Sequence, residues 1–128
     1  MPKRAIAPDG VPAGQYTPVV ESEGLVFLSG QVPFDENGSL IAGDFSTQAH
    51  QAFENMRRCL AAAGCEFSDV VKVTTFLADF GDASEYGQIY AEYFTEPYPA
   101  RSTVQAGLAG FKIEIEAVAR IPTPRSPS

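Results

Sequence analysis

Alternating apolar and polar residues are clearest near the end of the chain. From Phe111 to Ile121 two sides emerge, Ile113, Ile115, Ala117, Ala119 and Ile121 on one and Lys112, Glu114, Glu116 and Arg120 on the other. A period of two residues indicates a strand with one buried face. Before this strand, the prolines at 97 and 99 exclude a helix around these positions, so another strand is expected to begin near Arg101. A glycine-containing turn at 106–110 joins the two strands, and we expect them to pair as a hairpin.

Two other stretches follow the three- and four-residue spacing of an amphipathic helix. The first begins near Phe45 with Ser46 or Thr47 as its N-cap, closes at Gly64, and has the apolar positions Ala49, Phe53, Met56, Leu60 and Ala63. The second runs from about Ala83 to Phe94, with an apolar side made of Tyr86, Ile89, Tyr90 and Phe94. Aromatic residues at this spacing are typical of a core, so these side chains are expected to be buried.

Three further apolar runs predict strands at 19–24, 25–31 and 70–78, with a turn at Glu23–Gly24 between the first two. Asn37–Gly38 predicts an additional short hairpin. The order of strands, helix, strand, helix and two strands favours a two-layer α+β fold, with a mixed sheet and both helices on one face. We place a single domain at 1–121 and expect a disordered tail at 122–128, which is rich in proline and serine.

The second face of this sheet has no helix to cover it. It is expected to carry a mixed set of side chains: Lys72, Thr74, Phe76, Lys112, Glu114 and Glu116. A mixed, partly apolar face of this kind favours burial against other subunits.

Composition narrows the classes of function. The chain has 128 residues, 45% of them hydrophobic, which is enough for one core without disulfides. Its net charge of −7 argues against nucleic-acid binding, which relies on lysines and arginines. Cys59 and Cys65 form no metal-binding pattern with the single histidine, His50, so we expect no metal and two free thiols that are at least half-buried. No apolar run is long enough to span a membrane, and free thiols fit a reducing compartment, so a cytoplasmic protein is expected.

Arg101 is the first candidate for a binding role. A guanidinium offers paired donors in one plane and keeps its charge, which suits a small carboxylate. The alternative is an ordinary surface ion pair with a neighbouring acid. If the strand of Arg101 pairs with the next strand as a hairpin, Arg101 and Glu116 can face the same cleft.

Two polar side chains before the first helix are also candidates. Ser29 ends a strand, and because no motif with a catalytic base surrounds it, we interpret it as a hydrogen-bond donor rather than a nucleophile. Tyr16 is the one large side chain in the Gly- and Pro-containing segment 8–18. It is either a lid over the core or a ligand contact.

Together these segments resemble the Rid family of reactive intermediate deaminases, also called the YjgF or L-PSP endoribonuclease-like family. The resemblance spans nearly the whole chain, through the segments Leu28–Pro33, Ala62–Gly64, Val70–Leu77, Tyr90–Phe94, Pro99–Ser102 and Ile113–Ala119. It implies a chorismate-mutase-like α+β fold that assembles as a homotrimer with clefts between subunits. It also implies that neither a metal nor an organic cofactor is needed.

In active members of this family an arginine holds the substrate carboxylate, and Arg101 stands in its place. The resemblance also assigns the glutamate that positions water to Glu116, and substrate contacts to Ser29, with the adjacent Gly30, and to Tyr16. The implied reaction is hydrolysis of 2-imino or enamine acids, such as 2-iminobutanoate and 2-iminopropanoate released by pyridoxal-phosphate enzymes, to 2-keto acids and ammonia. Because an imine already hydrolyses in water, geometry rather than a strong nucleophile would supply the rate.

Two positions depart from the family pattern. Thr103 replaces a cysteine that is common two residues after the arginine, at a place where the backbone can make the catalytic contact. Gly87 replaces an asparagine near the substrate, and loss of that amide is expected to affect substrate range. Two alternatives to a deaminase stay open: a non-catalytic trimer that binds a small keto or amino acid, and an endoribonuclease, which the acidic charge and the lack of a paired histidine disfavour.

Overall fold

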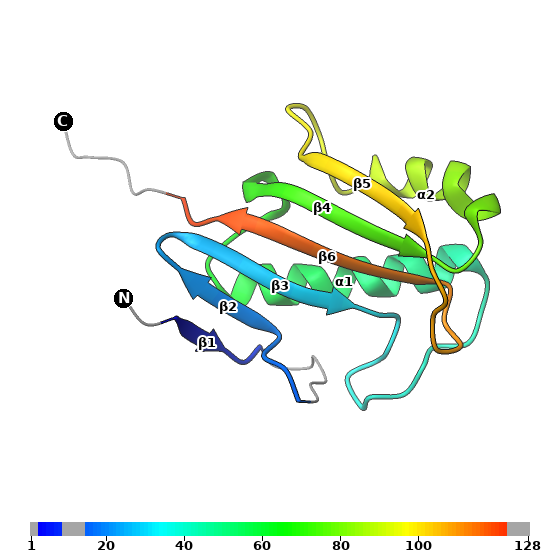
Figure 1. Ribbon diagram of the computed structural model, residues 1–128, viewed down its shortest axis with the longest axis horizontal. Coiled ribbons are helices and arrows are strands. Elements are labelled where there is room, and N and C mark those ends of the chain that lie inside the picture. Colours follow the sequence, from blue (N-terminus) through cyan, green and yellow to red (C-terminus); the bar gives the residue numbers. More distant parts are fainter. Residues whose placement is uncertain (1–2, 9–14, 123–128) are drawn as a thin grey trace.

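The structure, a computed structural model, describes residues 3–8 and 15–122 as one layer of strands and one layer of helices (Figure 1). In this part of the chain the strands and α-helices are β1 Arg4–Ile6, β2 Val19–Ser22, β3 Leu25–Gln31, α1 Phe45–Ala62, β4 Val70–Leu77, α2 Ala83–Tyr90, β5 Ala100–Gln105 and β6 Ile113–Arg120. Both α-helices cover one face of the sheet, which confirms the predicted two-layer α+β fold. We call this side the helix face and the uncovered side the open face.

The described sheet has six strands in the order β1-β2-β3-β6-β4-β5. Neighbouring strands are antiparallel except for β4 and β5, which run parallel. A parallel pair needs a crossover connection, and the segment that contains α2 supplies it. The sheet is therefore mixed, as predicted, with its single parallel pair at one edge.

The predicted hairpin between the last two strands is wrong. β6 lies between β3 and β4, whereas β5 pairs with β4 at the edge of the sheet. The alternation in β6 gave its buried side correctly, since Ile113, Ile115 and Ala119 are fully buried. Alternation says nothing about which strand is the partner, however. Burial explains the outcome: β6 fits the middle of the sheet, and β5, whose residues are nearly all exposed, fits its edge.

Both ends of α1 are fixed by local hydrogen bonds. The N-cap is Asp44 rather than the predicted Ser46 or Thr47, because its carboxylate accepts hydrogen bonds from Thr47 N at 2.9 Å and Thr47 Oγ1 at 2.8 Å. These bonds hold the pKa of Asp44 below its usual value. At the other end Gly64 has a φ of +76° and Cys65 N donates to Leu60 O, which closes the helix as predicted.

The core lies between the helices and the sheet. All five predicted apolar positions of α1 are buried, as are the four predicted for the second helix: Tyr86, Ile89, Tyr90 and Phe94. Phe53 is at the centre, with its ring centroid 4.3 Å from that of Tyr93 and about 6 Å from those of Tyr86 and Phe94. α2 ends at Tyr90, four residues earlier than predicted, because residues 91–93 tighten into a turn.

Two buried amides of α1 hold the loop that follows β3 and the entrance to β6. Gln48 donates to Ile41 O at 3.0 Å and accepts from Lys112 N at 2.9 Å, at the entrance to β6. Asn55 donates to the carbonyls of Val32 and Phe34, both at 2.9 Å, just after β3. Because a buried amide without partners is costly, these bonds fix where β3 ends and where β6 begins.

The short hairpins and the terminal segments differ in how well they match the predictions. The hairpin at Glu23–Gly24 is present, while that at Asn37–Gly38 is reduced to one bridge between Phe34 and Leu40. The short strand β1 was not predicted, because three residues carry too little pattern. The expected tail at 122–128 lies outside the described residues except for Pro122, as do residues 9–14 of the lead-in segment. No helix in the described residues is long and apolar enough to cross a membrane.

The substitution Phe53→Ala is expected to lower the free energy of unfolding by about 3–5 kcal/mol, since it leaves a cavity among several rings. Urea denaturation followed by circular dichroism measures this change. Phe80→Ala is the matched control, because its side chain is 51% exposed. The control is expected to change stability by less than about 1 kcal/mol. Equal destabilisation by the two substitutions would contradict the central place of Phe53.

Candidate active site

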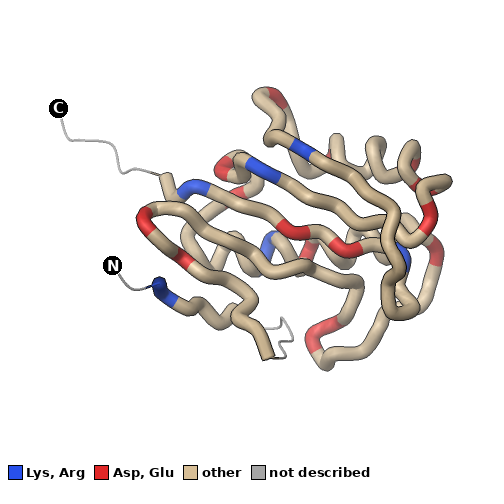
Figure 2. Tube along the Cα trace, in the orientation of Figure 1, with Lys and Arg blue, Asp and Glu red and all other residues tan. Residues whose placement is uncertain are grey.

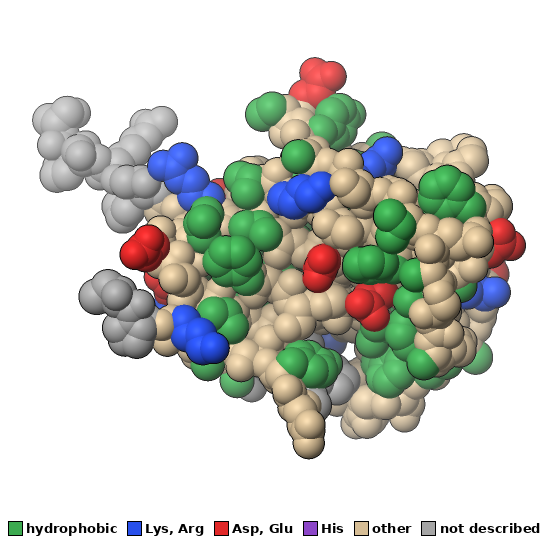
Figure 3. Space-filling view, viewed as in Figure 1, with side chains coloured by type: hydrophobic (Ala, Val, Ile, Leu, Met, Phe, Trp, Pro, Cys, Tyr) green, Lys and Arg blue, Asp and Glu red, His purple; other side chains and the backbone are tan. Residues whose placement is uncertain are grey.

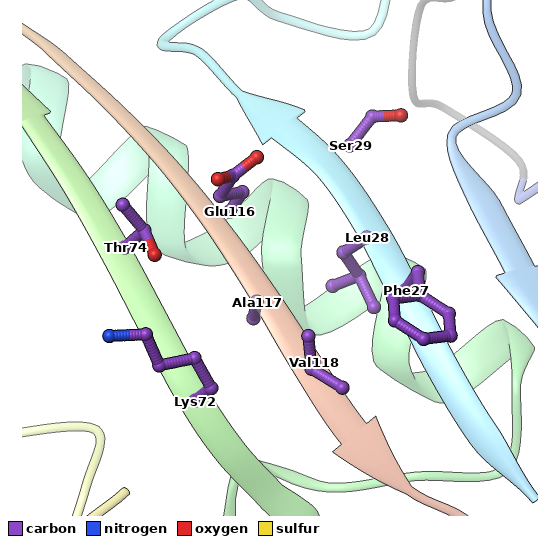
Figure 4. A pocket seen from close by; sticks show the side chains of 8 residues that line it. All are labelled: Phe27, Leu28, Ser29, Lys72, Thr74, Glu116, Ala117 and Val118. Carbon is purple, nitrogen blue, oxygen red and sulfur yellow. The ribbon is translucent and has the colours of Figure 1, made fainter. Parts of the chain in front are cut away.

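The first of two candidate hollows lies on the open face and holds about 330 Å³. It is lined by Phe27, Leu28, Ser29, Lys72, Thr74, Glu116, Ala117 and Val118, from β3, β4 and β6 (Figure 4). Thr74 is the register partner of Glu116, so these two side chains lie next to each other on this face. The hollow thus brings together two predicted site residues, Ser29 and Glu116. Lys72 and Thr74 belong to the predicted second face, but sequence reasoning gave them no role in a site.

Ser29 and Gly30 lie where the pairing of β3 with β6 shifts register, between Leu28 and Gln31. Ser29 Oγ donates to Thr17 O at 2.7 Å and Ser29 N donates to Pro18 O at 2.9 Å. Figure 4 shows the hydroxyl directed away from Glu116. Ser29 is therefore a donor, as interpreted from the sequence, but its partner here is the backbone of the segment that contains Tyr16.

At Gly30 a larger residue would force the Glu114 side chain to move. A Cβ atom at this position would lie 2.4 Å from Glu114 Oε2, so the carboxylate packs directly on the glycine backbone. Burial raises the pKa of the Glu114 carboxyl, and the nearby charge of Glu116 raises it further. Tyr16 is 51% exposed, which does not fit a lid over the core. It remains a predicted ligand contact.

Charges of both signs meet on the open face. Figure 2 shows acidic positions in the middle of β6 beside a basic position on β4. The basic side chain is Lys72, whose Nζ donates to Ser102 Oγ at 2.9 Å across β4 and β5. No ion pair joins Lys72 to Glu116 among the described residues. The Glu116 carboxylate therefore stays available to water or a ligand.

The second hollow lies beside α2 and holds about 340 Å³. It is lined by Gly87, Tyr90, Ala91, Tyr98, Pro99 and Arg101. The Arg101 guanidinium carbon lies 4.5 Å from the centroid of the Tyr90 ring and 5.8 Å from that of Tyr86. Within the described residues Arg101 has no carboxylate partner, so the surface ion pair considered from the sequence is not formed.

The predicted meeting of Arg101 and Glu116 in one cleft of a single chain is wrong. Arg101 is in register with Val73, which is fully buried on the helix face, and Glu116 is in register with Thr74 on the open face. Because successive residues of a strand point to opposite sides, Arg101 and Glu116 lie on opposite faces of the sheet. Thr103 shares the face of Arg101, beside Thr75, but it does not line the hollow.

A family model described as Endoribonuclease L-PSP matches residues 7–121. The chain belongs to this family, the Rid family. A 2-iminobutanoate/2-iminopropanoate deaminase from Homo sapiens is 41% identical over 109 residues, which cover 83% of this chain and 80% of that protein. The 3-aminoacrylate deaminase RutC from Acinetobacter baylyi is 38% identical over 126 residues, which cover 94% of this chain and 100% of that protein.

Solved structures agree with the Rid assignment. The Rid protein YyfA from Yersinia pestis has a TM-score of 0.89 and 32% identity, covering 94% of this chain and all of that one. The E. coli protein TdcF, solved with bound serine, has a TM-score of 0.83 and 33% identity, covering 91% of this chain and 98% of that one. These likenesses confirm the predicted fold.

Sequence reasoning missed several residues that line the hollows of this Rid chain. Phe27 was treated only as part of a strand, and Tyr90 only as core. Tyr90 is indeed buried, yet it also forms the surface on which Arg101 rests. Tyr90 on α2 and Ala91 at its C-cap follow Gly87 by three and four residues, and this spacing was the available signal that the three residues share one side of the helix.

The chemistry available to the Rid chain comes from these polar side chains. The described residues contain no group of three His, Cys, Asp or Glu side chains placed to hold a metal ion. Cys59 and Cys65 are free and buried, as predicted. Burial raises the pKa of Cys59 to about 12 and also raises the pKa of Cys65.

In the native protein the two thiols are therefore expected to react with a disulfide reagent such as Ellman's reagent about 100-fold more slowly than a free thiol does. An unperturbed thiol, with a pKa of about 8.5, becomes mostly thiolate as the pH rises from 8 to 9. Because both pKa values are raised, native labelling should stay slow across this range. Unfolding in guanidinium chloride should release both thiols. Fast labelling of the native protein at pH 8 would contradict their buried placement.

Proposed function

We propose that the chain hydrolyses 2-imino acids, or the enamines in equilibrium with them, to 2-keto acids and ammonia. The observation that carries the proposal is Arg101, a guanidinium held against Tyr90 at a hollow and free of any carboxylate partner in the described residues. Such a group is ready to take a small carboxylate through two parallel hydrogen bonds. Relatives at about 40% identity that carry deaminase names support the same reaction class.

The active site is formed by two copies of the chain in a homotrimer. One subunit cannot supply both Arg101 and Glu116 to one ligand, because they lie on opposite faces of its sheet. The open face also exposes large apolar side chains: Leu25 at 39%, Phe27 at 44% and Val104 at 42%. Figure 3 views this face and shows hydrophobic side chains gathered around charged ones. An apolar patch of this kind favours burial against another subunit.

In this cleft Arg101 of one subunit holds the carboxylate, and Glu116 of a neighbour holds a water near the imine carbon. Glu116 takes a proton as the water oxygen bonds to that carbon, and the C=N bond becomes a C–N bond. That proton passes to nitrogen and gives a carbinolamine. The hydroxyl proton of the carbinolamine then passes to the amino nitrogen, the C–N bond breaks as the C=O bond forms, and ammonia leaves. On the side of Glu116 the substrate contacts Ser29, Gly30 and Tyr16. On the side of Arg101 it contacts the backbone at Thr103.

The variant Arg101→Ala is expected to lower kcat/KM for 2-iminobutanoate by about 100-fold, the effect of losing two charge-assisted hydrogen bonds. Glu116→Gln is expected to lower kcat by about 100-fold or more, since it keeps the shape but removes the base. A threonine dehydratase supplies the imine, and the rate of its loss is measured. Arg120→Ala serves as the control for removing an exposed cation outside both hollows. Saturable binding of 2-ketobutyrate without turnover would assign the non-catalytic alternative instead.

Mixing the two impaired variants tests the shared cleft. In co-refolded mixed trimers, one cleft in about four receives an intact Arg101 from one subunit and an intact Glu116 from its neighbour, by random assortment. About a quarter of wild-type activity should therefore return, while each variant refolded alone stays impaired. A mixture as inactive as its components would contradict a site shared between subunits. Analytical ultracentrifugation of the same samples checks that trimers form.

A further inference from the structure

Gly87 is a glycine for which the folded chain gives no structural reason. It lies in the middle of α2, where glycine weakens a helix relative to alanine. Its φ is not positive, and apart from its chain neighbours and the backbone of the same helix no atom of the described residues lies within 4 Å of the position that a Cβ would occupy. Neither the backbone conformation nor the packing of this chain therefore requires glycine. The space left free at this position belongs to the hollow beside Arg101.

The walls of this hollow combine apolar and polar surface in about equal parts. Gly87 and Ala91 present backbone and a methyl group, and Tyr98 and Pro99 stand opposite on the segment that leads into β5. Tyr98 is 54% exposed, so its ring is available to a ligand. At about 340 Å³, the hollow has the volume of about eleven waters, at ~30 Å³ each. A methyl or ethyl side chain beside an Arg101-bound carboxylate would leave most of it empty.

The polar end of the hollow has an unused donor as well as a cation. The hydroxyl of Tyr90 is buried and has no hydrogen-bond partner among the described residues. Native proteins rarely leave such a group unpaired. The Arg101 guanidinium carbon lies 4.5 Å from the centroid of the Tyr90 ring, so the cation and this side chain are close together. A carboxylate held by Arg101 would give this hydroxyl an acceptor.

We propose that this hollow is a side-chain pocket, and that the enzyme prefers 2-imino acids with a large apolar or aromatic side chain over those with a methyl or ethyl group. The carboxylate lies against Arg101 and the Tyr90 hydroxyl, and the side chain lies over Gly87 between Tyr98 and Pro99. This inference rests on the proposed deaminase function for its reaction but not for its binding geometry. A hollow that combines apolar and aromatic side chains with a few convergent polar groups is typical of a small-molecule site.

The test compares two substrates in the wild type and in Gly87→Leu. An L-amino-acid oxidase generates the imines of phenylalanine and of 2-aminobutyrate, and the rate at which each imine is lost gives kcat/KM. The ratio of these values, phenylalanine-derived over 2-aminobutyrate-derived, is expected to exceed one in the wild type. It should fall by about 10-fold or more in Gly87→Leu, since added methylenes occupy the pocket. Leucine is a strong helix former, so α2 is retained.

Two further variants make the result specific. Gly107→Leu is the matched control, because Gly107 is exposed, has open space around it and lies outside both hollows. It should leave the ratio unchanged. Tyr90→Phe removes only the hydroxyl, and it should raise KM for both substrates alike, by about 3- to 10-fold, without changing the ratio. A wild-type ratio well below one, or a ratio that Gly87→Leu does not lower, would overturn the proposal.

Failure of the pocket and failure of the deaminase function give different results. Turnover of the small imine with a low ratio leaves the function standing and rejects the pocket. If no imine is hydrolysed, the function fails, and calorimetry with the stable keto acids then tests the pocket alone. Phenylpyruvate should bind more tightly than 2-ketobutyrate, and Gly87→Leu should weaken phenylpyruvate binding by about 10-fold. Equal binding of the two keto acids, or no binding of either, rejects the pocket.

Discussion

β5 runs parallel to β4, and this pairing decides on which face of the sheet Arg101 lies. Side chains in register on neighbouring strands share a face, so Arg101 follows the buried Val73 to the helix face. Glu116 follows Thr74 to the open face. A parallel partner requires a crossover, and α2 supplies both the connection and the ring of Tyr90 under Arg101. One topological choice thus places the cation and the carboxylate on opposite faces of the sheet.

The open face combines two demands that a solvated sheet surface would not meet. Its exposed Phe27, Leu25 and Val104 favour contact with another subunit, while in the proposed mechanism Glu116 has to remain accessible. At the register shift, Ser29 is hydrogen-bonded to the segment that contains Tyr16, and Glu114 packs on the backbone of Gly30. Glu114 then lies beside Glu116. Burial raises the pKa of the Glu114 carboxyl, and the charge of Glu116 raises it further. Stability and site geometry here depend on the same few residues.

Sequence periodicity predicted local structure well and pairing poorly, for a physical reason. Ile113, Ile115 and Phe53 are buried because they lie on the apolar side of their strand or helix. That side can be identified from the residues of the element alone. The partner of β5 depends on contacts far apart in the chain, so adjacency in sequence favoured a hairpin that does not form. The N-cap was misplaced because Asp44, Ser46 and Thr47 are all good caps, and only geometry chooses among them. The candidate residues were found by resemblance, but their division between two faces required the structure.

The support under Arg101 explains how a binding cation can be held without being neutralised. A resident carboxylate would fix the guanidinium through charge-assisted hydrogen bonds, and a substrate would have to break them first. The face of Tyr90 instead attracts the cation by only about 0.5–1 kcal/mol at an exposed site and leaves its donors free. Because Tyr90 is itself fixed by burial in the core, the guanidinium is positioned by the fold rather than by an ion pair. A rigid ring beneath a cation that has no carboxylate partner in the described part of the chain therefore gives orientation at little loss of affinity, which suits a site for small carboxylates.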